Sequence, residues 1–273
     1  MPDHILITNQ IKSFNKKINV SSDKSISIRS VLLASQAVGI SKITNLLESE
    51  DVLNTLKNIK KLGIKYTKIG KTYKIEGFGL NGFNIKKKTI IDAGNSGTLA
   101  RLILGLLVKT KFPVKLIGDK SLSKRDFSRV IKPLKLLGVN IKSKKDLIPI
   151  EITGTDFLRP ITYYEKIGSA QVKSCLILAA LNTPGKTIIN SKKSRDHTEI
   201  MLKYLKYPIE VQRKKSYDKI SVQGLNQFKS FNYNVPGDIS SAAFFIVLTL
   251  LSNKSKIVIK NINVNKSRTG IIT

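Results

Sequence analysis

The chain has 273 residues, 41% of them apolar, which is enough to bury a core in one or two domains and excludes wholesale disorder. Its apolar runs are shorter than the roughly 20 residues of a membrane span. The N-terminus lacks a secretory signal and Cys175 is the single cysteine, so we expect a cytoplasmic protein without disulfides or a membrane partner. The net charge of +30 comes almost entirely from lysines spread along the chain, which favours a solvated surface over a nucleic-acid patch.

Four segments of the chain repeat one pattern. Their anchors stand 72 residues apart, at Ser25, Gly97, Ser169 and Ser241, and each opens an apolar helix of about three turns. A strand is predicted after each helix, followed by a polar turn that carries charge. In the first three copies a second, amphipathic helix and further strands follow.

The repeated unit is therefore strand, helix, strand, helix, strand, strand (βαβαββ), which predicts an α/β fold. Two of the second helices end at a glycine, Gly63 and Gly138, which is typical of a helix stop, whereas the third ends before Pro208. Three copies are complete, and a fourth begins near Val235 and breaks off at Thr273. One unit cannot bury both of its faces, so we expect the copies to pack against one another.

Each helix start is a candidate anion site, because free N–H groups and the helix dipole attract negative charge there. Four positions after the anchor the first three copies carry a cation, namely Arg29, Arg101 and Lys173. Such a cation lies one turn along on the same helix face. The fourth copy has Phe245 instead. We therefore expect anion binding at the first three helix starts only.

The first helix start offers the richest set of donors. Lys24, Ser25 and Arg29 supply an ammonium, a hydroxyl and a guanidinium for a phosphate or carboxylate. A capped helix with an exposed cation explains this segment equally well.

The second and third helix starts give weaker signals. Within 92–101, Gly97 lets a ligand approach the backbone closely. Within 169–174, Ser169 and Gln171 offer a hydroxyl and an amide, although a capped core helix has the same pattern.

Among the other candidate residues, one pair of arginines suggests ligand binding, whereas the cysteine and a histidine are better explained by structural roles. Arg125 and Arg195 occupy equivalent polar turns of successive repeats and suggest two bound anionic groups, although surface salt bridges give the same pattern. Cys175 lies in an apolar run and is expected in the core rather than as a nucleophile. His197 is expected to support its turn, and no cluster has metal-ligand spacing, so we expect neither a metal nor a cofactor.

Six stretches together resemble the enolpyruvyl transferases, and within them the branch that acts on shikimate 3-phosphate. They are DKSISIR, DAGNSGTLAR, GDKSLSKRDF, SAQVKS, SRDHTE and VPGDISSAAFF, in that family's order and spacing. The resemblance implies an inside-out α/β barrel architecture, with two domains of three βαβαββ units each. Residues 21–234 would form one complete domain, and 1–20 with 235–273 part of a second, incomplete one. The complete protein is expected to be a monomer.

The resemblance also implies which residues bind the substrates. Those expected to hold shikimate 3-phosphate are Lys24, Ser25, Arg29, Ser169, Gln171 and Arg195. Those expected to face phosphoenolpyruvate are Lys24, Gly97, Arg125 and Gln171. The family's catalytic carboxylates match no position here, so the catalytic residues are unknown.

The reaction implied is transfer of the enolpyruvyl group from phosphoenolpyruvate to the 5-hydroxyl of shikimate 3-phosphate, on the shikimate route to chorismate and the aromatic amino acids. In this family the hydroxyl attacks C2 while C3 is protonated, and phosphate then leaves. That chemistry requires a base, an acid and fixed positive charge. Because the chain supplies the positive charge but not the carboxylates, we expect it to be inactive alone.

Two alternatives remain open. The enolpyruvyl transferase that acts on UDP-N-acetylglucosamine typically has a reactive cysteine in the loop that corresponds to SLSKRDF, and this loop has none. A basic RNA-binding module would show aromatic residues interleaved with a basic stripe. The sequence has no such stripe and no tryptophan.

Overall fold

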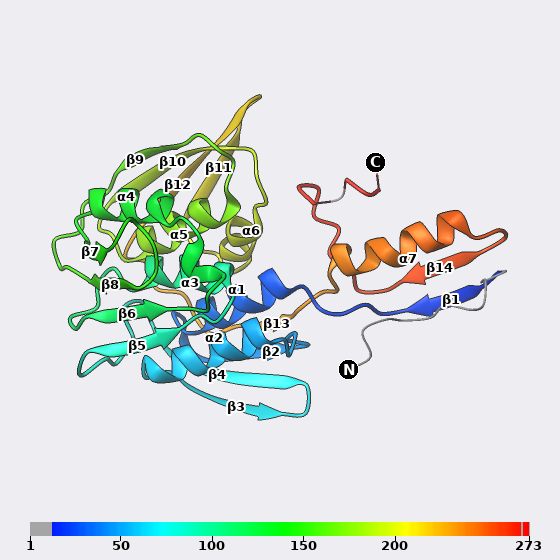
Figure 1. The fold of residues 1–273 in the computed structure, drawn as a ribbon, viewed down its shortest axis with the longest axis horizontal. Helices are drawn as coiled ribbons and strands as arrows, with labels where there is room; N and C mark the ends of the chain where they lie inside the picture. The colour runs from blue at the N-terminus through cyan, green and yellow to red at the C-terminus, as the bar shows by residue number, and fades with distance from the viewer. Residues whose placement is uncertain (1–12, 269, 273) are drawn as a thin grey trace. The chain divides into compact units, whose positions relative to one another are not determined.

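The computed structural model describes residues 13–268 and 270–272, which fall into two units (Figure 1). The larger unit is Lys24–Val235, and the smaller one combines the described residues up to Asp23 with those from Pro236 onward. Residues 1–12 of the segment expected to start the second domain, and positions 269 and 273 at its other end, lie outside the described residues. The division into a complete and an incomplete domain stays a prediction.

The order of helices and strands confirms the predicted α/β class and the βαβαββ repeat. The first copy comprises β1 (Asn15–Ile18), α1 (Lys24–Ala34), β2 (Val38–Thr44), α2 (Glu50–Lys61), β3 (Lys65–Ile69) and β4 (Thr72–Phe78). The second comprises β5 (Thr89–Asp92), α3 (Gly97–Leu106), β6 (Val114–Ile117), the 3-10 helix η1 (Leu122–Lys124), α4 (Ser128–Leu136), β7 (Asn140–Ser143) and β8 (Ile150–Thr153). The third comprises β9 (Thr162–Glu165), α5 (Ala170–Leu181), β10 (Lys186–Lys192), α6 (His197–Tyr204), β11 (Ile209–Arg213) and β12 (Tyr217–Gln223). The fourth comprises β13 (Asn232–Asn234), α7 (Ile239–Leu251) and β14 (Lys256–Ile259).

The larger unit contains three four-stranded sheets, in the orders β13-β2-β4-β3, β5-β6-β8-β7 and β9-β10-β12-β11. In each sheet the first pair of strands is parallel and the other two pairs are antiparallel. Figure 1 shows the sheets on the outside of this unit, with α1, α3 and α5 between them. These three helices are apolar around most of their circumference, as buried helices are, and almost all of their residues are buried.

One pairing departs from the simple repeat. The strand that precedes α1, β1, does not join the first sheet but pairs in parallel with β14 in the smaller unit. Its place beside β2 is taken by β13, with Asn232 opposite Lys42 and Asn234 opposite Thr44. The first and fourth copies have therefore exchanged their first strands, and the first sheet of the larger unit needs residues from both ends of that unit.

The second helices end as the sequence predicts, with one difference. Gly63 and Gly138 have φ angles of +91° and +103°, a left-handed conformation that costs glycine nothing. At the end of α6 that conformation is taken by Lys206, with φ of +54°, before Pro208.

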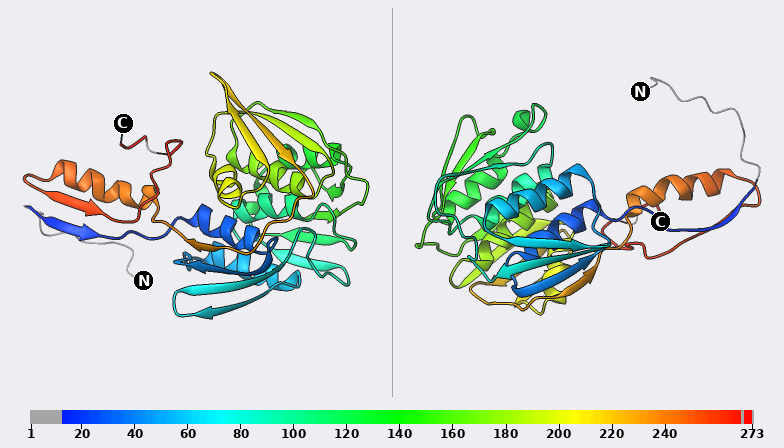
Figure 2. Two further views of the ribbon diagram at one scale, coloured as in Figure 1. Left: turned by 180° about the vertical axis from the view of Figure 1, so that it is seen from behind. Right: turned by 90° about the horizontal axis from the view of Figure 1, so that it is seen from below.

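The smaller unit consists of the parallel pair β1 and β14 with α7 alongside (Figure 2). The Asp238 side chain caps α7 by accepting a hydrogen bond from the Ser240 N–H, and Arg268 forms ion pairs with Asp23 and Asp238. Most apolar side chains of α7 are exposed, and only two of its residues are buried. None of the helices in the described part of the chain is long and apolar enough to cross a membrane.

Candidate functional site

The starts of α3 and α5 lie side by side and form the centre of the candidate site. Gln171, in the first turn of α5, accepts a hydrogen bond from Arg101 Nη1 at 3.0 Å and donates one to Thr98 Oγ1 at 3.0 Å. Each helix is capped by the serine before it: the Ser96 hydroxyl accepts from the Leu99 N–H and the Ser169 hydroxyl from the Val172 N–H. Two capped helix starts with their dipoles at one place favour an anion there.

Gly97 connects this centre to Arg125. A methyl group at position 97 would lie 2.9 Å from Arg125 Nη1 and 3.0 Å from Arg101 Nη1. Because both atoms are the ends of flexible side chains, glycine is needed here for the position of the guanidinium groups rather than for backbone conformation. Three of the four residues expected to face phosphoenolpyruvate, Gly97, Arg125 and Gln171, are thus brought together around Arg101.

Arg125 is exposed, and the turn before α3 fixes its direction. Its Nη2 donates to Asn95 Oδ1 at 2.9 Å, and Asn95 Nδ2 donates to Asp119 Oδ2 at 2.7 Å. The Asp119 carboxylate also accepts from the Leu122 N–H that opens the 3-10 helix η1. The guanidinium group is therefore held beside the helix start, although most of the side chain faces solvent.

Positive charge is concentrated at this centre. Burial lowers the pKa of the Arg101 guanidinium, and the neighbouring charges of Arg129 and Arg125 lower it further. The side chain is also stacked over the Phe127 ring, with 4.8 Å between the guanidinium carbon and the ring centroid. A concentration of like charge that lowers the pKa of one member attracts an anionic ligand.

Lys24 and Ser25 lie at the start of α1, where the sequence places them. Lys24 Nζ is 2.9 Å from Asp51 Oδ2 at the start of α2, and both side chains retain some exposure. The Ser25 carbonyl oxygen accepts a hydrogen bond from Arg29 Nη1 at 3.0 Å. The structure thus places Lys24 beside a carboxylate that a bound anion has to compete with.

Arg29 differs from the expected substrate cation because it is almost fully buried. Its Nε donates to Thr198 Oγ1 at 2.9 Å and its Nη2 to Ser174 Oγ at 3.1 Å. The side chain therefore connects α1 to α5 and α6. This connection holds the three helices together, whatever else Arg29 binds.

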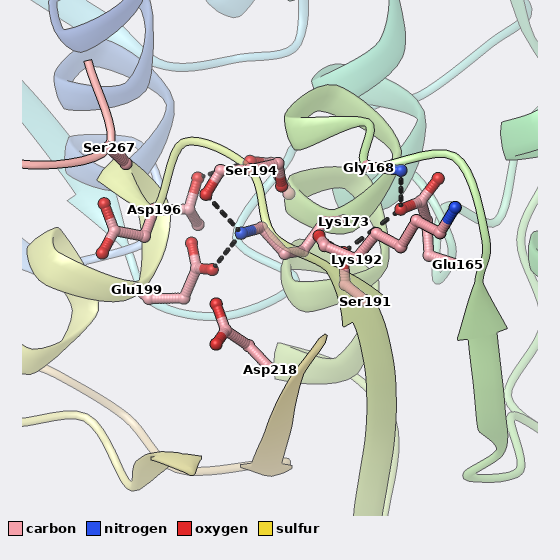
Figure 3. A network of polar contacts seen from close by, with 12 residues as sticks. Glu165, Gly168, Lys173, Ser191, Lys192, Ser194, Asp196, Glu199, Asp218 and Ser267 are labelled. Carbon is pink, nitrogen blue, oxygen red and sulfur yellow. Dashed lines mark hydrogen bonds and ion pairs between the residues drawn. The ribbon is translucent and has the colours of Figure 1, made fainter. Parts of the chain in front are cut away.

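The expectation that the Lys173 ammonium helps to bind an anion at the third helix start is wrong. The side chain is fully buried, with Nζ 2.8 Å from Glu199 Oε1 and donating to the Ser194 carbonyl oxygen at 3.4 Å (Figure 3). The physical reason is that the first turn of α5 faces α6 rather than solvent at this position. The repeat gives Arg29, Arg101 and Lys173 equivalent positions, but in the structure Arg29 and Lys173 are buried against other helices, whereas Arg101 lies at the centre of the candidate site.

Arg195 lies in the turn between β10 and α6, and it is exposed although Asp196 and His197 beside it are buried. Across residues 13–268 and 270–272, no side-chain partner is seen for its guanidinium group. His197 is the first residue of α6, and its role in supporting the turn stays a prediction. Cys175 is buried as expected, and burial raises the pKa of its thiol to about 12.

Sequence reasoning missed the carboxylates that shape the helix starts. Glu165, which is buried, accepts hydrogen bonds from the Gly168 N–H at 2.7 Å, the Ile167 N–H at 3.1 Å and Ser191 Oγ (Figure 3). In the previous repeat Asp92 accepts from the Gly94 N–H at 2.8 Å. In these two turns an acidic residue stands two or three positions before a glycine, and this pattern is a sequence signal that could have identified them.

A hollow of about 490 Å³ lies elsewhere, on the outer face of the sheet that contains β9 and β10. It is lined by Tyr164, Lys166, Asn190, Lys192 and Tyr217 among others, and by none of the residues expected at the site. In the described ranges there is also no group of three or more His, Cys, Asp or Glu side chains placed to hold a metal ion.

Comparison with known proteins gives a consistent result. The family model for EPSP synthase (3-phosphoshikimate 1-carboxyvinyltransferase) matches residues 8–273. A protein named 3-phosphoshikimate 1-carboxyvinyltransferase from Ruthia magnifica subsp. Calyptogena magnifica is 45% identical over 256 residues, which is 93% of this chain and 58% of that protein. One of the same name from Streptococcus sanguinis is 41% identical over 269 residues, or 97% of this chain and 62% of the relative.

Solved structures agree with the sequence relatives. The structure of EPSP synthase from Acinetobacter baumannii matches with a TM-score of 0.87 at 38% identity, and the match covers 96% of this chain and 58% of that one. The chain therefore spans about three fifths of the length of the relatives that it matches.

Proposed function

This chain belongs to the EPSP synthase family, and on that premise we propose that it carries the substrate-binding part of an enolpyruvyl transferase. The proposed reaction moves the enolpyruvyl group of phosphoenolpyruvate to the 5-hydroxyl of shikimate 3-phosphate and releases phosphate. The named relatives all point to this branch, and neither alternative left open by the sequence is favoured. The catalytic carboxylates are expected outside this chain.

The observation that carries the proposal is the cationic centre at the starts of α3 and α5. Gly97, Arg125 and Gln171 surround Arg101 there, and Arg101 has its pKa lowered by burial and by neighbouring cations. Fixed positive charge and helix starts are what a phosphorylated carboxylic acid requires, both for binding and for stabilising charge during phosphate departure. We assign this centre to phosphoenolpyruvate, together with Lys24.

For shikimate 3-phosphate we propose Lys24, Ser25, Arg29, Ser169, Gln171 and Arg195. Of these, Arg195 is the sharpest test, since it is exposed and its loss removes no contact seen in the described structure. Arg29 is a poor test, since it donates hydrogen bonds that hold α1 against α5 and α6.

The remaining proposals concern the whole protein. Residues 21–234 would be a complete domain, and 1–20 with 235–273 part of the other domain of the relatives. A monomeric state, a cytoplasmic location and the absence of nucleic-acid partners are likewise proposed from the family and from the spread of lysines.

The first experiment is calorimetric titration of the 273-residue chain with shikimate 3-phosphate, comparing wild type with Arg195→Ala. Loss of a charge-assisted hydrogen bond to phosphate should weaken binding about tenfold or more. Arg159→Ala is the matched control, because Arg159 is also an exposed arginine but is not among the residues expected at the site. The control should bind as wild type does.

The outcome has a definite reading. Binding at one site that is weakened in Arg195→Ala alone supports the proposal. Two outcomes would contradict the proposal that this chain binds shikimate 3-phosphate. One is a folded wild-type chain that does not bind shikimate 3-phosphate at all. The other is equal affinity in the Arg195→Ala and Arg159→Ala variants.

Turnover gives an independent test. The chain alone should show negligible enolpyruvyl transfer, and addition of the remaining C-terminal part of a relative should restore it. Robust turnover by the 273 residues alone would show that the catalytic carboxylates lie within them.

A further inference from the structure

The turn that carries Arg195 is held from both sides by buried charges. It links β10 to α6 and comprises Lys193, Ser194, Arg195 and Asp196. Arg195 is exposed, whereas Asp196, the next residue, is buried. The direction of its guanidinium group therefore depends on what holds the residues on either side.

On the N-terminal side of Arg195 the holding group is Lys173. Its ammonium is fully buried, donates to the Ser194 carbonyl oxygen at 3.4 Å and lies 2.8 Å from Glu199 Oε1 (Figure 3). Lys173 belongs to α5 and Glu199 to α6. One ammonium group therefore connects the central helix, the turn and the helix that follows the turn.

On the C-terminal side, two further contacts fix the start of α6. Asp196 Oδ2 accepts from Arg213 Nη2 of β11 at 2.6 Å. Thr198 Oγ1 accepts from Arg29 Nε and lies 2.8 Å from Ser174 Oγ. The turn is thus held by α5, β11 and α1, and Arg195 within it is exposed.

Stability alone does not account for the buried ion pair. A buried pair is often no more stabilising than an apolar pair of the same volume, because both ions must be desolvated. Here burial raises the pKa of the Glu199 carboxyl, against the opposing attraction of Lys173. Three buried oxygens of this cluster, Glu199 Oε2, Asp218 Oδ1 and Ser194 Oγ, also find no hydrogen-bond partner within the described residues. Such unpaired atoms cost stability.

We propose that Lys173 is a positioning residue, which orders the turn 193–196 through the Ser194 carbonyl and so aims Arg195 at the anionic ligand. The identity of that ligand, shikimate 3-phosphate, rests on the proposed function. The ordering of the turn does not, and it can be measured without any ligand.

Four variants separate positioning from stability. Lys173→Met removes the ammonium, and Lys173→Met with Glu199→Gln also removes the buried carboxylate that is left behind. Glu199→Gln alone keeps the ammonium and its bond to Ser194. Ile177→Ala, one turn further along the same face of α5, is the matched control, because Ile177 is fully buried and its truncation lowers stability by leaving a cavity.

The first readout is hydrogen exchange of the amides of residues 193–198 without ligand. Both variants that lack the ammonium should exchange about tenfold faster in this turn, whereas Glu199→Gln and Ile177→Ala should match wild type. The double variant decides the question, because it has no unpaired buried charge. If its turn is as protected as in wild type, the positioning role of Lys173 is overturned.

The second readout is the dissociation constant for shikimate 3-phosphate. The double variant should lose affinity about as strongly as Arg195→Ala, even where its melting temperature equals that of wild type. A loosened turn with unchanged affinity would overturn the claim that the turn aims Arg195. If wild type does not bind shikimate 3-phosphate, the proposed function fails, while the exchange measurement still decides whether Lys173 orders the turn.

Discussion

At the scale of single residues, the repeat predicted the positions of the cationic residues better than the directions in which their side chains point. Arg29, Arg101 and Lys173 are equivalent in sequence, yet Arg29 and Lys173 are buried and only Arg101 lies at the cationic centre. The sequence gives the helix face of each cation but not the acceptors that later repeats bring near it. Ser174 and Thr198, which receive the Arg29 hydrogen bonds, lie 145 and 169 residues away along the chain.

Gly97→Ala should change substrate binding without changing stability. The added methyl group displaces the Arg125 guanidinium, 2.9 Å away, which can move because it is exposed. We expect the KM for phosphoenolpyruvate to rise about tenfold in the enzyme completed with a relative's C-terminal part. The KM for shikimate 3-phosphate and the melting temperature should stay close to those of wild type.

Arg125→Lys provides the comparison, because it removes the fork of the guanidinium and keeps the charge. The same selective rise in the KM for phosphoenolpyruvate is expected. If Gly97→Ala instead raises both KM values equally, the glycine matters for the whole site and not for Arg125.

The pH dependence of stability should reveal the environment of Glu199. Burial raises its pKa above the ordinary 4.5, so the folded state holds this proton more tightly than the unfolded state does. The contribution of Glu199 to the free energy of unfolding therefore falls as pH rises from about 4.5 through the folded-state pKa. Glu199→Gln lacks this loss.

Thermal melts of both proteins at a series of pH values from about 4.5 upward test the sign. The melting temperature of wild type minus that of Glu199→Gln should decrease as pH rises. An increase over the same range would show that the attraction of Lys173 outweighs burial and that the pKa is lowered.

At the scale of helices and strands, much of the structure could be predicted. Apolar runs at a fixed spacing gave the four first helices, and Gly63 and Gly138 marked two helix ends through their left-handed conformation. The left-handed conformation of Lys206, at the end of α6, could not be predicted from the sequence. A non-glycine residue adopts the left-handed conformation only where the path of the following residues requires it. Pro208 by itself predicted that the helix ends, but not which residue takes that conformation.

The two helix caps give a prediction with an internal control. Ser96→Ala and Ser169→Ala each remove a hydroxyl that accepts from the backbone of the following helix, at 3.2 Å and 3.3 Å. Each should lower the free energy of unfolding by about 1 kcal/mol in denaturant titrations. Only Ser169→Ala should also weaken binding of shikimate 3-phosphate, since Ser96 is fully buried. Equal binding by the two variants would assign Ser169 to capping alone.

At the scale of the whole molecule, the exchange of first strands could not be predicted from the repeat. The three complete copies have the same order of strands and main helices, and the fourth begins in the same way. The sequence of β1 therefore does not show whether this strand joins its own sheet or pairs with the fourth copy. Partner choice is decided by contacts between distant segments, such as the Phe231 N–H with Ser41 Oγ, 190 residues apart. Such contacts leave no local pattern.

The exposed face of α7 should govern the behaviour of the chain in solution. Phe244, Leu250 and Leu251 are 79%, 78% and 81% exposed, and contiguous apolar surface of this kind promotes association. We expect Leu250→Lys with Leu251→Lys to reduce self-association in sedimentation experiments and to leave shikimate 3-phosphate binding unchanged. Leu136→Lys on the larger unit, at a position 56% exposed, is the control and should not alter association.

The pairing of β13 with β2 also determines when the first sheet can be completed during synthesis. A ribosome completes β2, β3 and β4 early, but the strand that covers the edge of β2 is made only with residues 232–234. At roughly 5–20 residues per second, that edge waits on the order of 10–40 s for its partner. Uncovered strand edges pair with other chains. The first sheet of the larger unit to be translated is therefore the last of its three to close, and it is the one that most needs protection on the nascent chain.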